Sequence, residues 1–245
     1  PRMDFEVKVY YPKRFEAMRR FYCGTHLDFL KSIFKAKAWS ASGGKAFLAF
    51  FKTHDEKYIF KEVKRSEFKM FIEFGPTYFD YMCKTFFHDF PCCLAKIVGA
   101  YVIKVKCDAQ PDLNSKTYIL VSENLNVGIK KEDEPDIITF DLKGSENNRL
   151  VTPPIGPNGP ERVTLLDNNF LYKLRGRPVV LRWRDAQDLY ICINNDIDCL
   201  SRMNIVDYSL LAIIDTRRKK IRFCILDYCQ YYNIKKQFEY HYKQT

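Results

Sequence analysis

The sequence is short of several features that define common classes of protein. Its 245 residues include four histidines, and its nine cysteines form no CxxC pair, so a zinc site has no support. No apolar run reaches the length of a membrane span, and no signal peptide is visible. Neither internal repeats nor low-complexity segments are found. Because the chain starts at Pro1, we expect it to be cut from a longer protein, and a targeting segment outside the cut would escape this test.

Acidic residues are outnumbered by basic ones, 30 to 40, which gives a formal net charge of +10. A basic surface predicts an anionic partner, which can be nucleic acid, a nucleotide or an acidic membrane. Charge alone does not choose among them, and a basic surface that only aids solubility is the plain alternative. The apolar fraction of 47% is typical of a globular protein with one large domain or two lobes. Most cysteines lie in apolar runs, so we expect reduced core residues of a cytosolic protein.

The first half of the chain predicts an antiparallel sheet with helices. A proline at position 12 opens one helix, Ser66 is a candidate N-cap of another, and Gly75-Pro76 is expected to interrupt that helix. The expected strands are residues 4–11, 46–52, 57–63, 95–106 and 117–123, and the expected helices are 12–22, 26–34, 66–74 and 77–87. A polar loop at 124–134 places a lobe boundary near residue 125, so we expect an N-terminal lobe at 1–125 and a C-terminal lobe at 126–245.

The second half predicts a second sheet with helices, and the fold class is therefore α+β. Strands are expected at 137–141, 208–214 and 221–227, with a Pro/Gly-rich loop at 152–160. Asp167 and Asp185 are candidate caps of two helices that run to about Leu174 and Met203. The basic tip at 217–220 can face an anionic membrane or be a solvated turn.

Several residues match the needs of phosphoryl transfer, a chemistry that depends on positioning and charge more than on a nucleophile. Gly43 and Gly44, followed by Lys45, could cradle phosphates, although a Gly-Gly pair is more often a simple hairpin turn. Lys61 could hold phosphates with Glu67 as its ion-pair partner, and a solvated strand lysine is the plain alternative.

Two aspartates form a stronger pair. Asp207 and Asp227 each stand at the edge of an apolar strand, and the intervening hairpin should fold them back near each other. One carboxylate near a substrate hydroxyl and one on magnesium is the layout of kinase-like sites. The alternative is that one or both cap turns, as aspartate often does.

Three segments resemble one known family. DLKGS at 141–145 with Arg149 beyond it, NIVDYSLLAIID at 204–215 and FCILDY at 223–228 resemble the phosphatidylinositol phosphate kinases, in which these motifs occur in this order. Finer details resemble the type III branch, the phosphatidylinositol 3-phosphate 5-kinases of the PIKfyve group. These details are SGGK, EFGPTYFDYM, KIVGAYVI, SEN, VTLLDNNFL and KKQFE. The resemblance covers residues 3 to 240.

The resemblance implies a two-lobed kinase fold distantly related to protein kinases, with ATP and Mg²⁺ as cofactors. It implies that Lys143 stabilises the transferring phosphoryl group, Asp141 orients the segment, and Gly144 permits close approach of the backbone. Arg149, with Ser145 nearby, would hold a substrate or nucleotide phosphate.

The same resemblance assigns the remaining roles. Lys61 would contact ATP phosphates, and Glu123 and Asn124 would form a hinge near adenine. Asp207 would be catalytic, and Asp227 would bind magnesium. The implied partner is a phosphoinositide in a membrane surface, reached from the cytoplasm on endosomal or vacuolar membranes. Possible scaffold subunits are not identified, and a nucleic-acid partner is disfavoured because no stacking-aromatic motif or recognition helix explains the charge.

Two departures keep alternatives open. Ala46 and Phe47 stand where the family has a Ser-Gly pair, and a phenylalanine cannot replace a glycine where the backbone must approach a phosphate. The lipid-selecting activation segment, expected beyond ILDY and its tail, is absent from this chain. The first hypothesis is a kinase for the 5-hydroxyl of phosphatidylinositol 3-phosphate. The others are a phosphoinositide-binding scaffold with a degenerate nucleotide site, and a kinase for another phosphoinositide such as phosphatidylinositol 4-phosphate.

Overall fold

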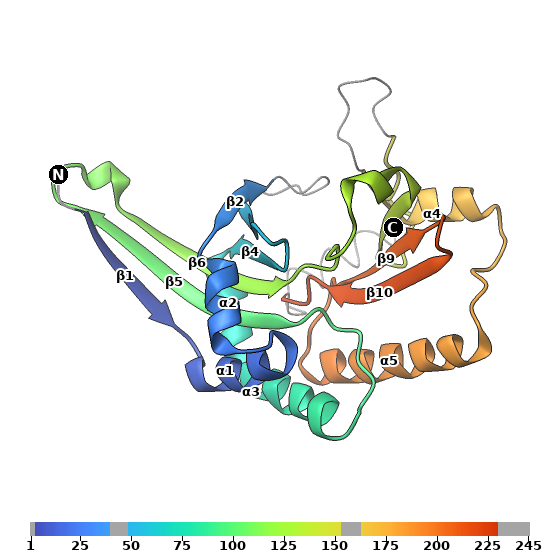
Figure 1. Cartoon of the computed structure of the whole chain (residues 1–245), viewed down its shortest axis with the longest axis horizontal. Helices are drawn as coiled ribbons and strands as arrows, with labels where there is room; N and C mark the ends of the chain where they lie inside the picture. Colours follow the sequence, from blue (N-terminus) through green and yellow to red (C-terminus); the bar gives the residue numbers. More distant parts are fainter. Residues whose placement is uncertain (1–2, 40–48, 153–162, 230–245) are drawn as a thin grey trace, which may run out of the picture. The chain divides into compact units, whose positions relative to one another are not determined.

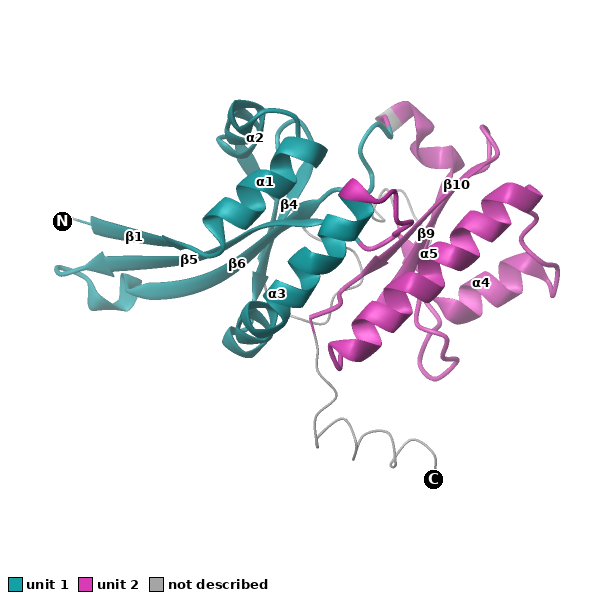
Figure 2. Cartoon of the chain, turned by 90° about the horizontal axis from the view of Figure 1, so that it is seen from below, with its two compact units in different colours: residues 1–86, 95–129 teal, residues 87–94, 130–245 magenta. Residues whose placement is uncertain are grey.

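A computed structural model describes residues 3–39, 49–152 and 163–229 of the chain (Figure 1). The chain divides into two compact units, one of residues 1–86 and 95–129 and one of residues 87–94 and 130–245 (Figure 2). Each unit combines helices with a largely antiparallel sheet, which confirms the predicted α+β class. Over the described ranges, no helix combines the length and the hydrophobicity needed to cross a bilayer.

The first unit is an antiparallel sheet with three α-helices, counted over its described residues. The strand order is β1-β5-β6-β4-β3-β2. The strands are β1 (Met3–Val9), β2 (Ala36–Trp39), β3 (Phe50–Thr53), β4 (Tyr58–Val63), β5 (Ile97–Cys107) and β6 (Ser115–Glu123). The helices are α1 (Pro12–Tyr22), α2 (His26–Ile33) and α3 (Arg65–Phe87), with the short 3-10 helix η1 (Pro111–Leu113) between β5 and β6.

Helix starts in this unit follow from local sequence. Pro12 is the first residue of α1, where its missing N–H costs nothing and its fixed φ suits a helix. At α2, the Thr25 hydroxyl accepts the Asp28 N–H and the Asp28 carboxylate accepts the Thr25 N–H, which is a capping box. The predicted helices at 12–22 and 26–34 are therefore confirmed to within one residue. The predicted cap at Ser66 is wrong, because α3 already begins at Arg65.

The expected break at Gly75-Pro76 is also wrong, because α3 continues through both residues. A proline at position 76 removes the N–H that would bond to the carbonyl of Ile72. The Tyr11 hydroxyl donates to that same Ile72 oxygen at 2.6 Å. Gly75 makes room for this contact, since a Cβ there would lie 2.8 Å from the Tyr11 ring. A tertiary hydrogen bond thus replaces the lost helical one.

This replacement predicts a stability effect that depends on the proline. Tyr11→Phe should lower the free energy of unfolding by about 1 kcal/mol, because it leaves the Ile72 carbonyl without a donor. In a Pro76→Ala background, the new N–H can bond to Ile72, so Tyr11→Phe should cost almost nothing. Denaturant unfolding of the four proteins measures the coupling. Equal costs in both backgrounds would show that the hydroxyl does not serve this carbonyl.

The second unit contains a four-stranded sheet in the order β10-β9-β7-β8, counted over its described residues. Its strands are β7 (Ile137–Leu142), β8 (Thr164–Leu165), β9 (Ser209–Asp215) and β10 (Lys220–Leu226). Its helices are α4 (Asp167–Leu174) and α5 (Trp183–Arg202), with the 3-10 helix η2 (Lys131–Asp136) before β7. The β7–β8 pair is parallel and the others are antiparallel. Phe140, Leu165 and Ala212 form a buried core on this sheet.

Residues 87–94 belong to the second unit although both flanking segments belong to the first. The Cys93 N–H donates to the buried Asp196 carboxylate of α5 at 2.7 Å, and the Ile225 N–H of β10 donates to the Cys93 carbonyl. Leu94 also forms a parallel bridge with Ile225. These contacts fix the segment to both α5 and β10. The predicted lobes at 1–125 and 126–245 differ from the compact units in this segment and at residues 126–129.

Both aspartates predicted as caps in the second unit lie inside their helices. Leu166 and Arg182 occupy the N-cap positions, so Asp167 is the first residue of α4 and Asp185 lies in the first turn of α5. The Asp185 carboxylate accepts two hydrogen bonds from the Arg182 guanidinium. Asp167 has a different role that becomes clear at the candidate site.

All nine cysteines lie in the described ranges and are thiols, as predicted. Only Cys107, Cys199 and Cys224 are buried, and Cys83 is exposed, so the expectation of core positions is wrong for several of them. Burial, together with the Asp196 carboxylate, raises the pKa of the Cys93 thiol.

Candidate active site

Three strands of the second unit's sheet terminate or begin at the same end of the sheet. Leu142, the last residue of β7, pairs with Leu210, and Leu226, the last residue of β10, pairs with Ser209. The end of β7, the start of β9 and the end of β10 therefore lie side by side. Lys143 follows β7, Asp207 precedes β9 and Asp227 follows β10. The register thus gathers three residues that the sequence separates widely.

Lys143 and Asp207 form an ion pair at this end of the sheet. The Lys143 ammonium donates to the Asp207 carboxylate at 2.6 Å and to the Asp207 main-chain carbonyl at 3.0 Å. Both side chains remain 30% exposed, so a ligand can reach them. Asp207 and Asp227 adopt left-handed backbone conformations, with φ of 65° and 62°, and Asp227 is exposed. Such strained conformations in non-glycine residues often accompany functional sites.

Asp167 holds the loop that carries Lys143. Its carboxylate accepts the Lys143 N–H at 3.0 Å and the Gly144 N–H at 2.8 Å. It also accepts the Arg149 Nε–H at 2.7 Å. Burial tends to raise the pKa of Asp167, but the hydrogen bonds from Arg149, Gly144 and Lys143 outweigh it and hold the pKa below its usual value. Gly144 has φ of 68°, which allows the sharp turn after Lys143.

Arg149 closes the same loop from the other side. Its Nη2 donates to the main-chain carbonyl of Asp141 and, at 3.2 Å, to the Asp141 carboxylate. Its side chain is 16% exposed and bridges two acids. Arg149 therefore holds the loop through Nε and Nη2. A phosphate, as predicted for this residue, would have to bind to the remaining guanidinium N–H groups. The role predicted for Asp141, which is to orient the segment, stays a prediction.

Sequence reasoning missed the role of Asp167 and took it for a helix cap. An acid between an apolar run and a helix is usually a cap. Only the parallel pairing of β8 with β7, in which Leu165 lies opposite Phe140, places Asp167 beside the loop. The sequence offered one signal, which is Arg149: an arginine that becomes half-buried in the fold requires a carboxylate partner. Ser145 is exposed, and its hydroxyl accepts the Asn147 N–H at 3.4 Å.

The candidate nucleotide residues that the structure describes lie in the first unit. Lys61 is half-buried on β4 between Phe50 of β3 and Leu120 of β6, and its ammonium lies 5.9 Å from the Phe50 ring centroid. Glu67 is half-buried in the first turn of α3. Their pairing stays a prediction. The predicted cradle at Gly43, Gly44 and Lys45 lies outside the described residues, as do Ala46 and Phe47.

The two predicted hinge residues use their side chains to fix the backbone. The Glu123 carboxylate accepts the Lys96 N–H at 2.7 Å. Asn124 is 5% exposed, donates to the Glu56 carbonyl at 2.6 Å and accepts the Asn126 N–H at 3.1 Å. Their predicted hinge role stays a prediction.

Part of the basic tip at the β9–β10 turn is neutralised within the unit. The Arg218 guanidinium donates to Asp133 of η2 at 2.8 Å and to Asp215 at 3.0 Å. These hydrogen bonds raise the pKa of Arg218, and they lower the pKa of Asp133. Thr216 donates to the Asp136 carbonyl through both its N–H and its hydroxyl. Arg218 thus fastens the turn to η2.

A comparison with known protein families assigns the chain to a class of kinases. The family model described as Phosphatidylinositol-4-phosphate 5-Kinase matches residues 34–223, so the chain belongs to this family. The resemblance found in the sequence is thereby confirmed.

Curated relatives carry more particular names. The chain is 32% identical over 232 residues to the 1-phosphatidylinositol 3-phosphate 5-kinase FAB1 of Saccharomyces cerevisiae, covering 95% of this chain and 10% of that protein. It is 35% identical over 242 residues to the Homo sapiens 1-phosphatidylinositol 3-phosphate 5-kinase, covering 98% and 11%. Identity to FAB1B of Arabidopsis thaliana is 32% over 240 residues, covering 97% and 13%. The chain therefore spans only about a tenth of the length of these relatives.

Proposed function

We propose that the protein is an ATP-dependent lipid kinase that phosphorylates the 5-hydroxyl of phosphatidylinositol 3-phosphate. The observation that carries the proposal is the Lys143–Asp207 ion pair on a loop held by Asp167 and Arg149. A preorganised lysine beside an accessible carboxylate suits phosphoryl transfer, which needs positioning and charge stabilisation. The relatives named as phosphatidylinositol 3-phosphate 5-kinases support the substrate.

Asp207 and Lys143 divide the chemistry at the acceptor hydroxyl. The Asp207 carboxylate accepts the hydroxyl proton as the inositol oxygen attacks the γ-phosphorus of ATP. The Lys143 ammonium, a compact point charge, then neutralises charge on the transferring group. Its present partner, the Asp207 carboxylate, keeps it at the site before substrate arrives. ADP leaves with the electron pair of the broken phosphorus–oxygen bond.

The carboxylates at this end of the sheet are suitable ligands for magnesium. Mg²⁺ is usually held by one or two carboxylates together with phosphate oxygens and water. Asp227 offers an exposed carboxylate next to the end of β10. When bound, the ion would neutralise phosphate charge. Lys61 and Glu67, the segment 43–45, and the main chain at Glu123 and Asn124 are proposed to hold ATP.

A second candidate function rests on one residue. Phe47, at a position where the family has glycine, favours a phosphoinositide-binding scaffold that binds nucleotide poorly. Calorimetric titration of the intact protein with ATP and Mg²⁺ separates the two. The kinase proposal predicts saturable binding that requires Mg²⁺ and weakens in Lys61→Met. Absence of any nucleotide binding by the folded protein would favour the scaffold.

The choice of lipid is tested by a panel of head groups. Turnover is compared on vesicles that contain phosphatidylinositol 3-phosphate, phosphatidylinositol 4-phosphate or phosphatidylinositol. We expect the 3-phosphate to be preferred, and preference for the 4-phosphate would correct the substrate while leaving the kinase proposal in place. The same proposal implies peripheral attachment to endosomal or vacuolar membranes from the cytoplasm. Scaffold subunits are left open.

A further inference from the structure

The connection between α4 and α5 carries an exposed set of basic and apolar side chains. We call residues 173–184 the α4–α5 segment. No residue in it is buried and none is acidic. Its basic residues are Lys173, Arg175, Arg177, Arg182 and Arg184.

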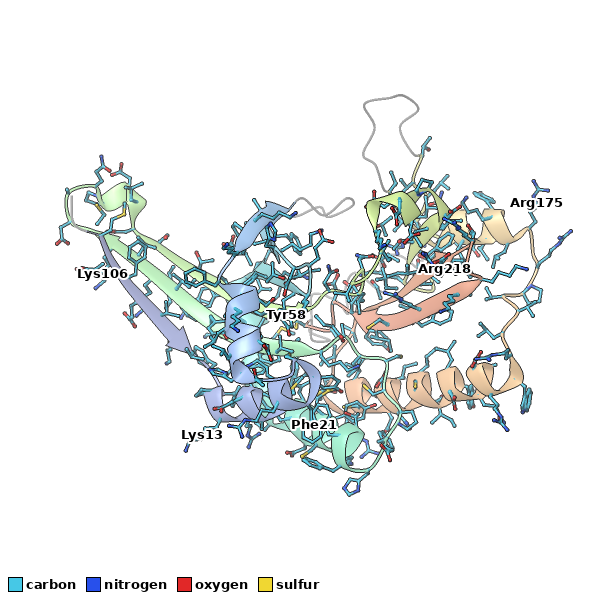
Figure 3. All side chains as sticks on the ribbon, viewed as in Figure 1. Lys13, Phe21, Tyr58, Lys106, Arg175 and Arg218 are labelled. Carbon is cyan, nitrogen blue, oxygen red and sulfur yellow. The ribbon has the colours of Figure 1, made fainter. Side chains whose placement is uncertain are left out.

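Most of these positive charges are not neutralised within the unit. Arg182 is paired with Asp185. Over the described residues, no acidic side chain forms an ion pair with Arg175, Arg177 or Arg184. Figure 3 shows the Arg175 side chain pointing away from its unit. A chain stretch of this kind attracts an anionic partner.

Large apolar side chains lie among these charges. Val180 is 87% exposed and Trp183 is 75% exposed. Trp183 and Tyr190, seven positions apart on α5, share one helix face, and both line a hollow of about 370 Å³ together with Ile191. Exposed tryptophan and aliphatic side chains beside basic residues are typical of surfaces that lie in the interface of an anionic bilayer.

The hairpin tip at 217–220, another basic stretch of this unit, lacks the apolar side chains. Arg218 is committed to Asp133 and Asp215, and the tip has no apolar residue. The expectation that the tip faces a membrane is therefore better met by the α4–α5 segment.

The α4–α5 segment is also linked to the candidate site through one helix. Asp167, at the start of α4, holds the Lys143 loop, and the last turn of α4 leads into the segment. Eight helical residues rise about 12 Å. We propose that the α4–α5 segment docks the protein on an anionic lipid bilayer, with Val180 and Trp183 inserted among the headgroups and the arginines facing lipid phosphates. This inference rests on the proposed function, since it names the surface that brings the kinase to its lipid.

Vesicle binding of the intact protein tests the proposal without ATP. The vesicles contain phosphatidylcholine, phosphatidylserine and phosphatidylinositol 3-phosphate, and binding is measured by cosedimentation. The triple variant Arg175→Glu, Arg177→Glu, Arg184→Glu should lower the partition coefficient by at least about a hundredfold, since each basic residue contributes about fivefold at such a surface and each added carboxylate is repelled by it. The matched control makes the same charge change at the tip, with Arg217→Glu, Lys219→Glu and Lys220→Glu, and should change binding by about twofold or less.

A second variant removes the apolar contribution without changing charge. Val180→Gln with Trp183→Gln should weaken binding about tenfold, because two exposed apolar side chains no longer enter the interface. Phe34→Gln, at an aromatic of the first unit that is 85% exposed, is its control and should have no effect. Circular dichroism of each variant shows that it is folded.

The outcomes separate docking from catalysis. Equal losses for the two charge-reversed triple variants, or no loss for either, would overturn the docking proposal. If binding depends on the α4–α5 segment but the protein forms no bisphosphate, the docking proposal stands and the kinase proposal is refuted. If the protein phosphorylates the lipid but its binding to vesicles does not depend on the segment, the kinase proposal stands and the docking proposal is refuted.

Discussion

Replacing Asp207 by asparagine is expected to lower kcat for phosphatidylinositol 3-phosphate about a thousandfold, since a general base contributes on this order. An amide cannot take the proton from the attacking hydroxyl. Its oxygen can still accept the hydrogen bond that Lys143 donates to the carboxylate at 2.6 Å. The loop should therefore keep its geometry, and the KM for ATP should change little.

The control for this variant is Asp198→Asn, which makes the same chemical change on α5. Asp198 is exposed and paired with Arg202, so the change should leave kcat within about twofold. Turnover of Asp207→Asn within tenfold of the unmodified protein would remove Asp207 from the chemistry. An unfolded Asp207→Asn protein would be recognised by circular dichroism, and Asp207→Ser then repeats the test.

Asp167→Asn is expected to lower both activity and stability. The asparagine oxygen can still accept the main-chain N–H groups of Lys143 and Gly144, which both donate to Oδ1, but its charge is lost and its amide N–H₂ then faces the donor Nε of Arg149. Loss of hydrogen bonds to a charged, nearly buried group should lower the free energy of unfolding by about 2 kcal/mol. Because the Lys143 loop then loosens, kcat should fall about a hundredfold, as expected when a positioned group is displaced.

Positioning is distinguished from a purely structural role by kinetics and coupling. The KM for ATP should hardly change. Arg149→Met should add little to the loss already caused by Asp167→Asn, giving a coupling energy above about 1 kcal/mol. Asp185→Asn, in the first turn of α5 and paired only with exposed Arg182, is the matched control and should cost under about 0.5 kcal/mol. Fully additive losses would contradict the loop-holding role.

The pH dependence of unfolding offers an independent check on Asp167. Its pKa is lower in the folded protein than in the unfolded chain, because Arg149, Gly144 and Lys143 donate to the carboxylate. The unfolded chain thus binds the proton first, so this contribution is present above about pH 4 and is lost as the pH falls further. Asp167→Asn should make the acid limb of the stability profile less steep. An unchanged acid limb would show that the carboxylate gains nothing from these donors.

The sequence predicts the helices and strands well where local signals decide them. Pro12 and the strands around 97–107, 115–123 and 209–226 follow from capping and from apolar patterning. It fails at Gly75-Pro76, because a tertiary hydrogen bond from Tyr11 replaces the one that the proline removes. Similarly, no local pattern shows that residues 87–94 attach to α5 and β10.

For the candidate site, the sequence indicates the residue types but not their partners. Motif resemblance points to Lys143, Asp207 and Asp227, and strand register then explains why they lie at the same end of the sheet. The hydrogen bonds by which Arg149 and Asp167 hold the loop depend on the two-residue strand β8. This strand is too short to be recognised as a periodic pattern in the sequence. The sequence leaves the charged tip as a candidate membrane-facing surface or a solvated turn, because it does not reveal that Asp133 neutralises Arg218.

The most direct test of lipid kinase activity is transfer of labelled phosphate from ATP to vesicles that contain phosphatidylinositol 3-phosphate. The intact protein is compared with Asp207→Asn under identical conditions with Mg²⁺, and the labelled lipid is analysed for the position of the new phosphate. We expect phosphatidylinositol 3,5-bisphosphate from the unmodified protein and almost none from the variant. Absence of labelled lipid from a folded protein that binds both ATP and the vesicles, or equal product from both proteins, would contradict this expectation.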